Sequence, residues 1–328
     1  MKKIVLIVFV LAAHYLSAQD CTKELLAQKP GTWKAGLPGS IHNVSSADLV
    51  KEKAVFAGIH SMVSSKYSPL GCQVLYSTAY GKVPSAGQTW IADPYSYTMY
   101  ILPFLCDSKS ADKSKYTIAI SSATNVTITA NEISWLNTLY AATIPVDDSR
   151  GYFKLEQRPQ KKDGHFNMGE QVMGDSQEEN KTVEYRWLIT YNDTLPFSYL
   201  SRREYLQIQQ KRLEKWIKES PGEKADSQKY FDNISDYLTK PEDELNQTAI
   251  SMSNDEQRFV GFVQEGTRGS FIAVKPNMAY YRKNRPNSSP QFFTIVYKLT
   301  QNDPVFEENV AAIKEAIDLA SLKNMLGK

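Results

Sequence analysis

Apolar residues recur at the helical spacing of three and four positions in four segments of the chain. The clearest stripe runs through Asp226–Lys240, where aromatic and aliphatic residues fall at i, i+1, i+4, i+7 and i+8. The other three segments begin after Ser45, Ser201 and Asp303, residue types that are preferred as helix N-caps. The pattern therefore predicts four helices, which end near Lys66, Glu219, Lys240 and Gly327.

The helix after Ser201 has the strongest start signal. Ser201 and Glu204 have the S-x-x-E spacing of a capping box, in which each side chain accepts a hydrogen bond from the backbone N–H of the other residue. A strand over Val183–Tyr191 and the turn pair Asn192-Asp193 precede this helix. The chain around Ser201 is thus expected to form a strand, a turn and then a central, capped helix.

Alternating apolar and polar residues, rich in β-branched and aromatic side chains, predict further strands. In Asn125–Ala130, Val126 and Ile128 alternate with Thr127 and Thr129. The other predicted strands are Cys72–Tyr80, Tyr95–Cys106, Lys115–Ser121, Gly151–Gln157, Glu256–Gln264, Ser270–Lys275 and Gln291–Leu299. The pattern leaves Gln19–Val44 irregular, and Ile133–Tyr140 fits a short helix or a strand.

The polar stretch Arg158–Asn180 has weak periodicity. Its pair Asp163-Gly164 has the composition of a type I′ turn, which joins two antiparallel strands. We expect a mobile hairpin or loop here.

Runs of strands with helices at their flanks favour an α+β fold over a doubly wound α/β fold. We expect antiparallel sheets whose helices pack on one face. A boundary near Thr194–Leu195 would separate a β-rich part, residues 19–194, from a helix-rich α+β part, residues 195–328. A single continuous domain is the alternative, because the strand before Thr194 leads closely into the capped helix.

Residues 1–18 have the pattern of a secretory signal peptide. Lys2 and Lys3 precede the apolar run Ile4–Ala13, and the small residues Ser17 and Ala18 stand before Gln19. We therefore expect export to the periplasm or the medium. Lipid anchoring at Cys21 is disfavoured, because Gln19 and Asp20 separate this cysteine from the small residues.

The charge balance gives no support to nucleic-acid binding. The chain has 38 basic and 36 acidic residues, and removal of Lys2 and Lys3 leaves 36 of each. No later stretch has the length and hydrophobicity of a transmembrane segment.

Three cysteines, Cys21, Cys72 and Cys106, permit one disulfide in an oxidising compartment. Cys72 begins one predicted strand and Cys106 ends another, so we favour the pair Cys72–Cys106. Pairing of either residue with Cys21 is the alternative.

The sequence contains no recognised motif of catalysis, metal binding or cofactor binding. The histidines His42, His60 and His165 lack metal-ligand spacing, and His165 is expected to be solvated. The acidic runs Glu178-Glu179 and Glu242-Asp243-Glu244 are typical of surface charge. No catalytic residue, metal ligand or cofactor is therefore assigned.

The segment Met278–Phe293 contains the candidate ligand-binding residues. Tyr280 and Tyr281 stand beside Arg282 and Arg285, and aromatic rings with guanidinium groups suit sugars, carboxylates or phosphates. The competing interpretation is a long loop whose tyrosines pack back onto the sheet.

Three features carry a resemblance to a group of proteins: the Ser-Ala end of the signal, Pro-Gly-Thr-Trp at Pro30–Trp33, and Leu-Ser-Arg-Arg-Glu-Tyr-Leu at Leu200–Leu206. In these features the chain resembles uncharacterised secreted proteins of Bacteroidetes-type bacteria. The resemblance implies export and transfers no catalytic residue or cofactor.

Two functions remain. We expect a secreted or periplasmic protein that binds a glycan, a peptide or a cell-envelope partner without catalysis. The alternative is a secreted hydrolase with an unrecognised carboxylate site, which two facing carboxyl groups in a cleft would support.

Overall fold

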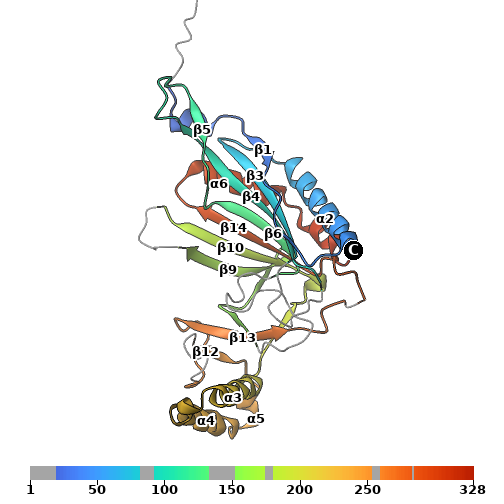
Figure 1. The fold of residues 1–328 in the computed structure, drawn as a ribbon, viewed down its shortest axis with the longest axis vertical. Coiled ribbons are helices and arrows are strands. Elements are labelled where there is room, and N and C mark those ends of the chain that lie inside the picture. Colours follow the sequence, from blue (N-terminus) through green and yellow to red (C-terminus); the bar gives the residue numbers. More distant parts are fainter. Residues whose placement is uncertain (1–19, 82–91, 133–151, 174–179, 253–258, 283) are drawn as a thin grey trace, which may run out of the picture.

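The computed structural model describes residues 20–81, 92–132, 152–173, 180–252, 259–282 and 284–328. It has an α+β fold in which helices pack against two separate β-sheets (Figure 1). The predicted fold class is therefore confirmed. The signal peptide and the segment Ile133–Tyr140 lie outside the described residues.

The large sheet contains β1 (Thr32–Ala35), β2 (Ile41–His42), β3 (Cys72–Gly81), β4 (Tyr95–Cys106), β5 (Tyr116–Ile118), β6 (Asn125–Ala130), β8 (Gln160–Lys162), β9 (His165–Met173), β10 (Thr182–Ile189) and β14 (Phe293–Thr300). The small sheet contains β7 (Phe153–Leu155), β11 (Phe197–Tyr199), β12 (Ile250–Met252) and β13 (Ser270–Pro276). The helices are α1 (Lys23–Ala27), α2 (Ser46–Ser64), α3 (Arg202–Glu219), α4 (Lys224–Leu238), α5 (Glu242–Leu245), α6 (Pro304–Ala316) and α7 (Leu319–Met325).

Strands of the large sheet follow the order β1-β3-β4-β6-β14-β10-β9-β8. All neighbours along this order are antiparallel except β1, which pairs in parallel with β3. The segment predicted to be irregular thus supplies an edge strand. Gly31 and Gly39 permit its close approach, because a Cβ atom would lie 2.1 Å from the Cys72 carbonyl oxygen and 1.9 Å from that of Thr78.

Alternation along the strands gives the large sheet two different faces. On the inner face, Val126, Ile128 and Ala130 of β6 are completely buried and pack in the same core as residues of α2, α6 and α7. The other face, which we call the outer face, carries the intervening residues such as Thr127 and Thr129. We call the large sheet with α1, α2, α6 and α7 the large unit.

The small sheet packs with α3, α4 and α5, and we call this assembly the small unit. Its strands β11, β12 and β13 and its three helices all lie between β10 and β14 in the sequence. The chain leaves the large sheet near the predicted boundary at Thr194–Leu195. However, β14, α6 and α7 return to the large unit, so the two units are not divided into residues 19–194 and 195–328.

The capping box at Ser201 is confirmed. The Ser201 hydroxyl accepts from the Glu204 N–H at 3.2 Å, and a Glu204 carboxylate oxygen accepts from the Ser201 N–H at 2.9 Å. The same carboxylate also binds Lys275 of β13. The start of α3 is therefore held both by its own capping box and by an ion pair to the small sheet.

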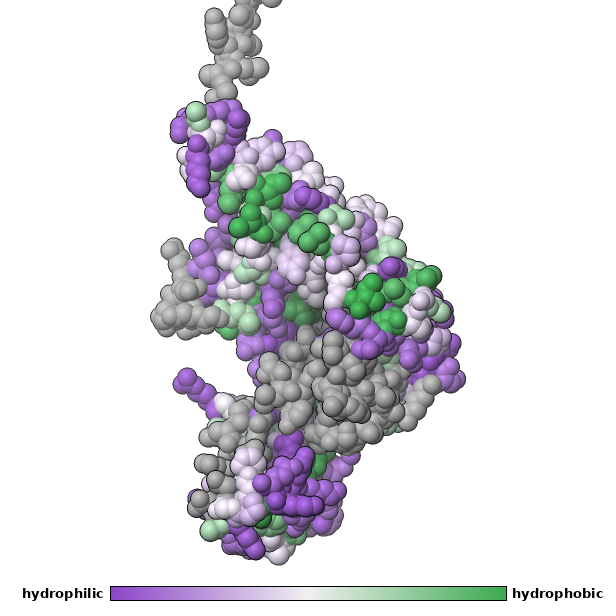
Figure 2. Space-filling model, viewed as in Figure 1, coloured by the Kyte–Doolittle hydropathy of each residue, from purple (hydrophilic) through white to green (hydrophobic). Residues whose placement is uncertain are grey.

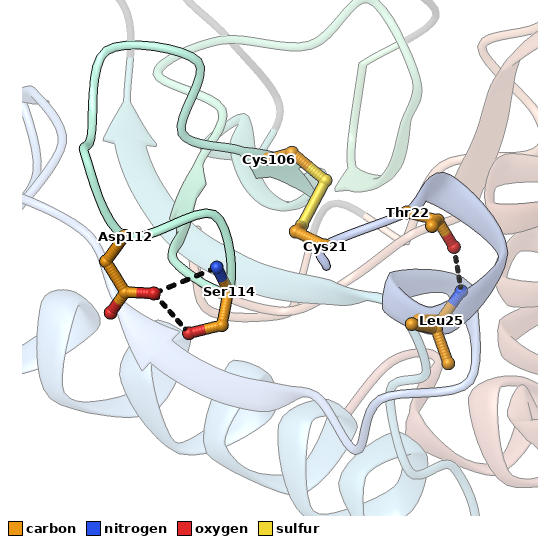
Figure 3. Close-up of a disulfide and its surroundings, with 6 residues drawn as sticks. All are labelled: Cys21, Thr22, Leu25, Cys106, Asp112 and Ser114. Atoms are coloured by element: carbon orange, nitrogen blue, oxygen red, sulfur yellow. Dashed lines mark hydrogen bonds between the residues drawn. A yellow bond between two sulfur atoms is a disulfide. The ribbon is translucent and has the colours of Figure 1, made fainter. Parts of the chain in front are cut away.

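The predicted disulfide Cys72–Cys106 is wrong. Cys21 bonds to Cys106, with their Cα atoms 5.6 Å apart (Figure 3). Cys72 is a free thiol in the core. The register explains the error, because Cys72 lies opposite Pro103 and β4 continues three residues further to Cys106.

Two local predictions need correction. The last predicted helix breaks at Ile317 and Asp318, because the Asp318 carboxylate caps α7 by accepting from the Ala320 and Ser321 N–H groups. Residues 259–264 do not form a strand. The hairpin predicted after Arg158 is confirmed, because β8 and β9 pair across a turn in which Asp163 and Gly164 have the positive φ values of 43° and 85°.

Candidate functional site

The predicted recognition patch is not an exposed surface. Tyr280 and Tyr281 are each only 7% exposed and belong to the hydrophobic cluster between the two sheets. The Tyr280 hydroxyl donates to the Gln291 carbonyl oxygen at 2.7 Å, and the Tyr281 hydroxyl donates to the Pro196 carbonyl oxygen at 2.8 Å. The prediction that these rings bind a ligand is therefore wrong, and the packing interpretation is correct.

The two arginines of this segment are exposed, but one of them is engaged locally. The guanidinium group of Arg282 lies 4.0 Å from the centre of the Tyr191 ring, and its backbone N–H donates to the Gln291 side chain. Arg285 is exposed at the adjacent turn. Without exposed tyrosine faces beside them, these arginines do not form the expected recognition site.

The outer face of the large sheet is a better candidate surface. The small sheet covers its β9–β10 end, where Phe166, Met168 and Leu188 join the cluster between the sheets. On β3, β4 and β6 the outer-face side chains are mostly half-buried, so they retain contact with solvent. Figure 2 shows apolar and weakly polar residues on the large unit, whereas hydrophilic residues dominate the region of α3, α4 and α5.

Two cross-strand rows of polar residues cross this half-open area. One row contains Ser77, Thr98 and Thr127 on successive strands, with the Thr98 and Thr127 hydroxyl oxygens 3.1 Å apart. The next row places Tyr100 between Leu75 and Asn125. Hydroxyl and amide groups both donate and accept hydrogen bonds, so the surface suits a neutral polar ligand.

A partly buried ion-pair network lies at the end of the second row. Lys298 of β14 follows Asn125 in the register, and its ammonium group lies 3.2 Å from a carboxylate oxygen of Glu184. The other oxygen of Glu184 accepts from Arg186 Nε at 2.7 Å, and Arg186 is only 5% exposed. These three charges are therefore paired with one another at the edge of the half-open area.

A pair of buried carboxyl groups lies on the opposite side of the sheet. Glu52 of α2 is completely buried and Asp93, just before β4, is 6% exposed. The two carboxyl groups are within hydrogen-bonding reach of each other. Burial, and then the neighbouring charge of Asp93, raise the pKa of Glu52 to about 8.

This pair meets only part of what a hydrolase needs. The carboxyl groups face each other and one is strongly desolvated, as in several acid–base sites. Yet Glu52 has no solvent-exposed surface and Asp93 has almost none, so neither carboxyl group is accessible to a substrate in this structure.

The histidines occupy different environments. The pKa of His60 is lowered by burial, and its Nδ1 atom lies 2.8 Å from the Tyr97 hydroxyl. His165 was expected to be solvated, but it is 5% exposed and its ring lies 4.2 Å from that of Trp187. Burial lowers the pKa of His165.

Metal ligands do not cluster in the part of the chain that the structure describes. There, no group of three or more His, Cys, Asp or Glu side chains could hold a metal ion. The acidic run at Glu242 forms surface ion pairs, with Glu242 bound to Arg203 and Glu244 to Arg202.

No described helix has both the length and the apolar character required to cross a membrane. Comparisons with protein-family models, curated proteins and solved structures found no match to the chain.

Sequence reasoning missed both the outer face and the carboxyl pair. The threonines of β6 were visible as an alternating pattern, but their neighbours come from strands that are distant in sequence. Glu52 and Asp93 are 41 positions apart, and neither belongs to a motif. The one available signal was Glu52 itself, a charged residue between Leu49 and Val55 of an apolar helix stripe.

Proposed function

We propose that this is an exported, non-catalytic binding protein, and that the half-open outer face of the large sheet holds a neutral glycan. The row of hydroxyl groups on Ser77, Thr98 and Thr127 carries this proposal, because hydroxyl groups match the paired donors and acceptors of sugars. Tyr100 and Leu75 supply the apolar contact beside it.

Two further observations support this function. The disulfide between Cys21 and Cys106 is typical of an oxidising compartment outside the cytoplasm. The open area has hydroxyl, amide and aromatic groups, and the charges of Lys298, Glu184 and Arg186 beside it are paired with one another. A neutral ligand therefore suits it better than a phosphate or a strongly acidic peptide.

A glycan array followed by calorimetry of the best ligand tests the proposal. We expect Tyr100→Ala to weaken binding at least tenfold, because it removes the aromatic contact, while the protein stays folded. Thr98→Val keeps the shape of the side chain and removes its hydroxyl, so it should weaken binding by several-fold.

Tyr116→Ala is the matched control, because Tyr116 is a 40% exposed tyrosine on β5, away from the two rows. Equal loss of binding in the Tyr116 and Tyr100 variants, or no glycan bound by the wild type, would contradict the proposed function.

The second candidate function is a secreted hydrolase that uses Glu52 and Asp93. Their mutual approach and the raised pKa of Glu52 favour it. Their burial disfavours it, so we rank binding first. Hydrolysis of any glycan by the wild type, lost in Glu52→Gln, would reverse this order.

A further inference from the structure

The carboxyl group of Glu52 has an unusual environment for a charged group. Its residue is completely buried, and neither carboxylate oxygen has a hydrogen-bond donor as a partner. The carboxyl group of Asp93 interacts with it directly, and as an anion this group can only accept hydrogen bonds. Two buried carboxylates in contact repel each other and lack solvation, so both cannot be ionised without a large free-energy cost.

The groups that act electrostatically on this pair do not neutralise it. Asp48, one turn earlier on α2, is another acid. Tyr80 of β3 and Tyr95 of β4 face the pair, and burial raises the pKa of each phenol, so both rings stay neutral. None of these described groups brings a positive charge to the pair.

We propose that Glu52 and Asp93 share one proton and act as a pH-sensitive latch between α2 and the start of β4. The proton turns one carboxyl group into a donor and the other into its acceptor, which satisfies both buried groups. When the proton leaves to bulk water, two anions remain in contact and the latch opens.

The carboxyl pair lies where four segments are joined by hydrogen bonds: α2, the start of β4, the end of β6 and residues 287–291. The Asp93 N–H donates to the Asn287 carbonyl oxygen at 2.7 Å, and the Asp93 carbonyl oxygen accepts from the Asn131 side chain at 2.8 Å. Ser288 donates from its hydroxyl to Asp48 at 2.8 Å. Opening therefore loosens α2, the end of β6 and the 287–291 segment together.

The same segment connects to the end of the chain. The Ser289 hydroxyl donates to a Lys328 oxygen at 2.7 Å, and the Gly327 N–H donates to the Pro290 carbonyl oxygen at 2.8 Å. The proposed opening would thus be transmitted to the C-terminal residues.

The direction of the pH effect follows from the raised pKa of Glu52. Between its ordinary value of 4.5 and its value of about 8, the folded protein binds more protons than the unfolded chain. The stabilisation is therefore fully present below pH 4.5 and is lost as the pH rises to about 8.

The test measures unfolding by denaturant at pH 5, 7 and 9 for the wild type, Glu52→Gln and Glu308→Gln. In the wild type, the folding equilibrium constant should fall at least tenfold from pH 5 to pH 9. Because Gln cannot ionise, this fall should be absent in Glu52→Gln. Glu308→Gln is the matched control, because it makes the same change at an exposed helical glutamate. Unchanged pH dependence in Glu52→Gln would overturn the proposal.

Two measurements on the wild type keep the test valid if Glu52→Gln does not fold. Infrared spectroscopy should detect a protonated carboxyl group at pH 6 that disappears by pH 9, and its absence at pH 6 would reject the shared proton. Calcium or magnesium should not stabilise the protein at pH 9. Stabilisation by either ion that EDTA reverses would show that a cation occupies the pair, and this result also overturns the proposal.

Discussion

The core of the large unit joins residues from both ends of the chain, whereas the core of the small unit comes from the middle of the chain, interrupted by β8, β9 and β10. Phe56 of α2 and Leu322 of α7 belong to the same cluster in the large unit. In the small unit, the buried cluster extends only from Tyr152 to Ala273. The large unit therefore has its contacts at long sequence separation and cannot form before β14 and the last helices are available.

The two units also differ in how their ends are held. The large unit has a covalent tie from its N-terminal segment to the end of β4, through Cys21 and Cys106. The small unit depends on local devices such as the Ser201 capping box and on packing of α3 against the small sheet. The comparison predicts that perturbations of the large unit have the larger effects.

The largest expected effect follows removal of the disulfide. Cys21→Ser should lower the free energy of unfolding by about 4.5 kcal/mol in the loop-entropy model, because the bond joins residues 85 positions apart. Denaturant titration with and without a reducing agent measures this change. The reductant should weaken only the wild type, and equal stability of both proteins would contradict the assigned pairing.

The next effect concerns the junction between the units. Tyr280→Ala should cost about 3 kcal/mol, because it leaves a cavity in the cluster between the sheets and removes the hydrogen bond to Gln291. Arg285→Ala, at an exposed position of the same segment, should change stability by less than about 0.5 kcal/mol. Similar denaturation midpoints for the two variants would mean that Tyr280 is not part of the packed junction.

The smallest effect is expected at the helix caps. Ser201→Ala in the small unit and Ser45→Ala in the large unit each remove a hydroxyl group that accepts from a backbone N–H. Each change should cost roughly 0.5–2 kcal/mol in the free energy of unfolding. Chemical denaturation compares them directly, and a cost near zero for Ser201→Ala would show that Glu204 and Lys275 hold the start of α3 without the serine.

Local sequence determined much of the secondary structure. The caps at Ser45, Ser201 and Asp303 each precede a helix, and Asp163-Gly164 forms the predicted hairpin turn. These features depend on residues within about four positions of one another, so their hydrogen bonds do not depend on which distant segments pack beside them. The α+β class followed from the same local patterns.

Tertiary structure alone decided the order of the strands, the disulfide and the candidate sites. β14 lies between β6 and β10 because its apolar inner residues complete a core that starts at α2. Cys106 meets Cys21 because α1 packs beside the far end of β4, and Tyr280 is buried because a second sheet covers it. Glu52 shows no partner in its own helix, and its contact with Asp93 arises only when α2 packs onto the sheet. Such contacts depend on which surfaces meet across long sequence separations, and a periodic pattern specifies that a face is buried without specifying what buries it.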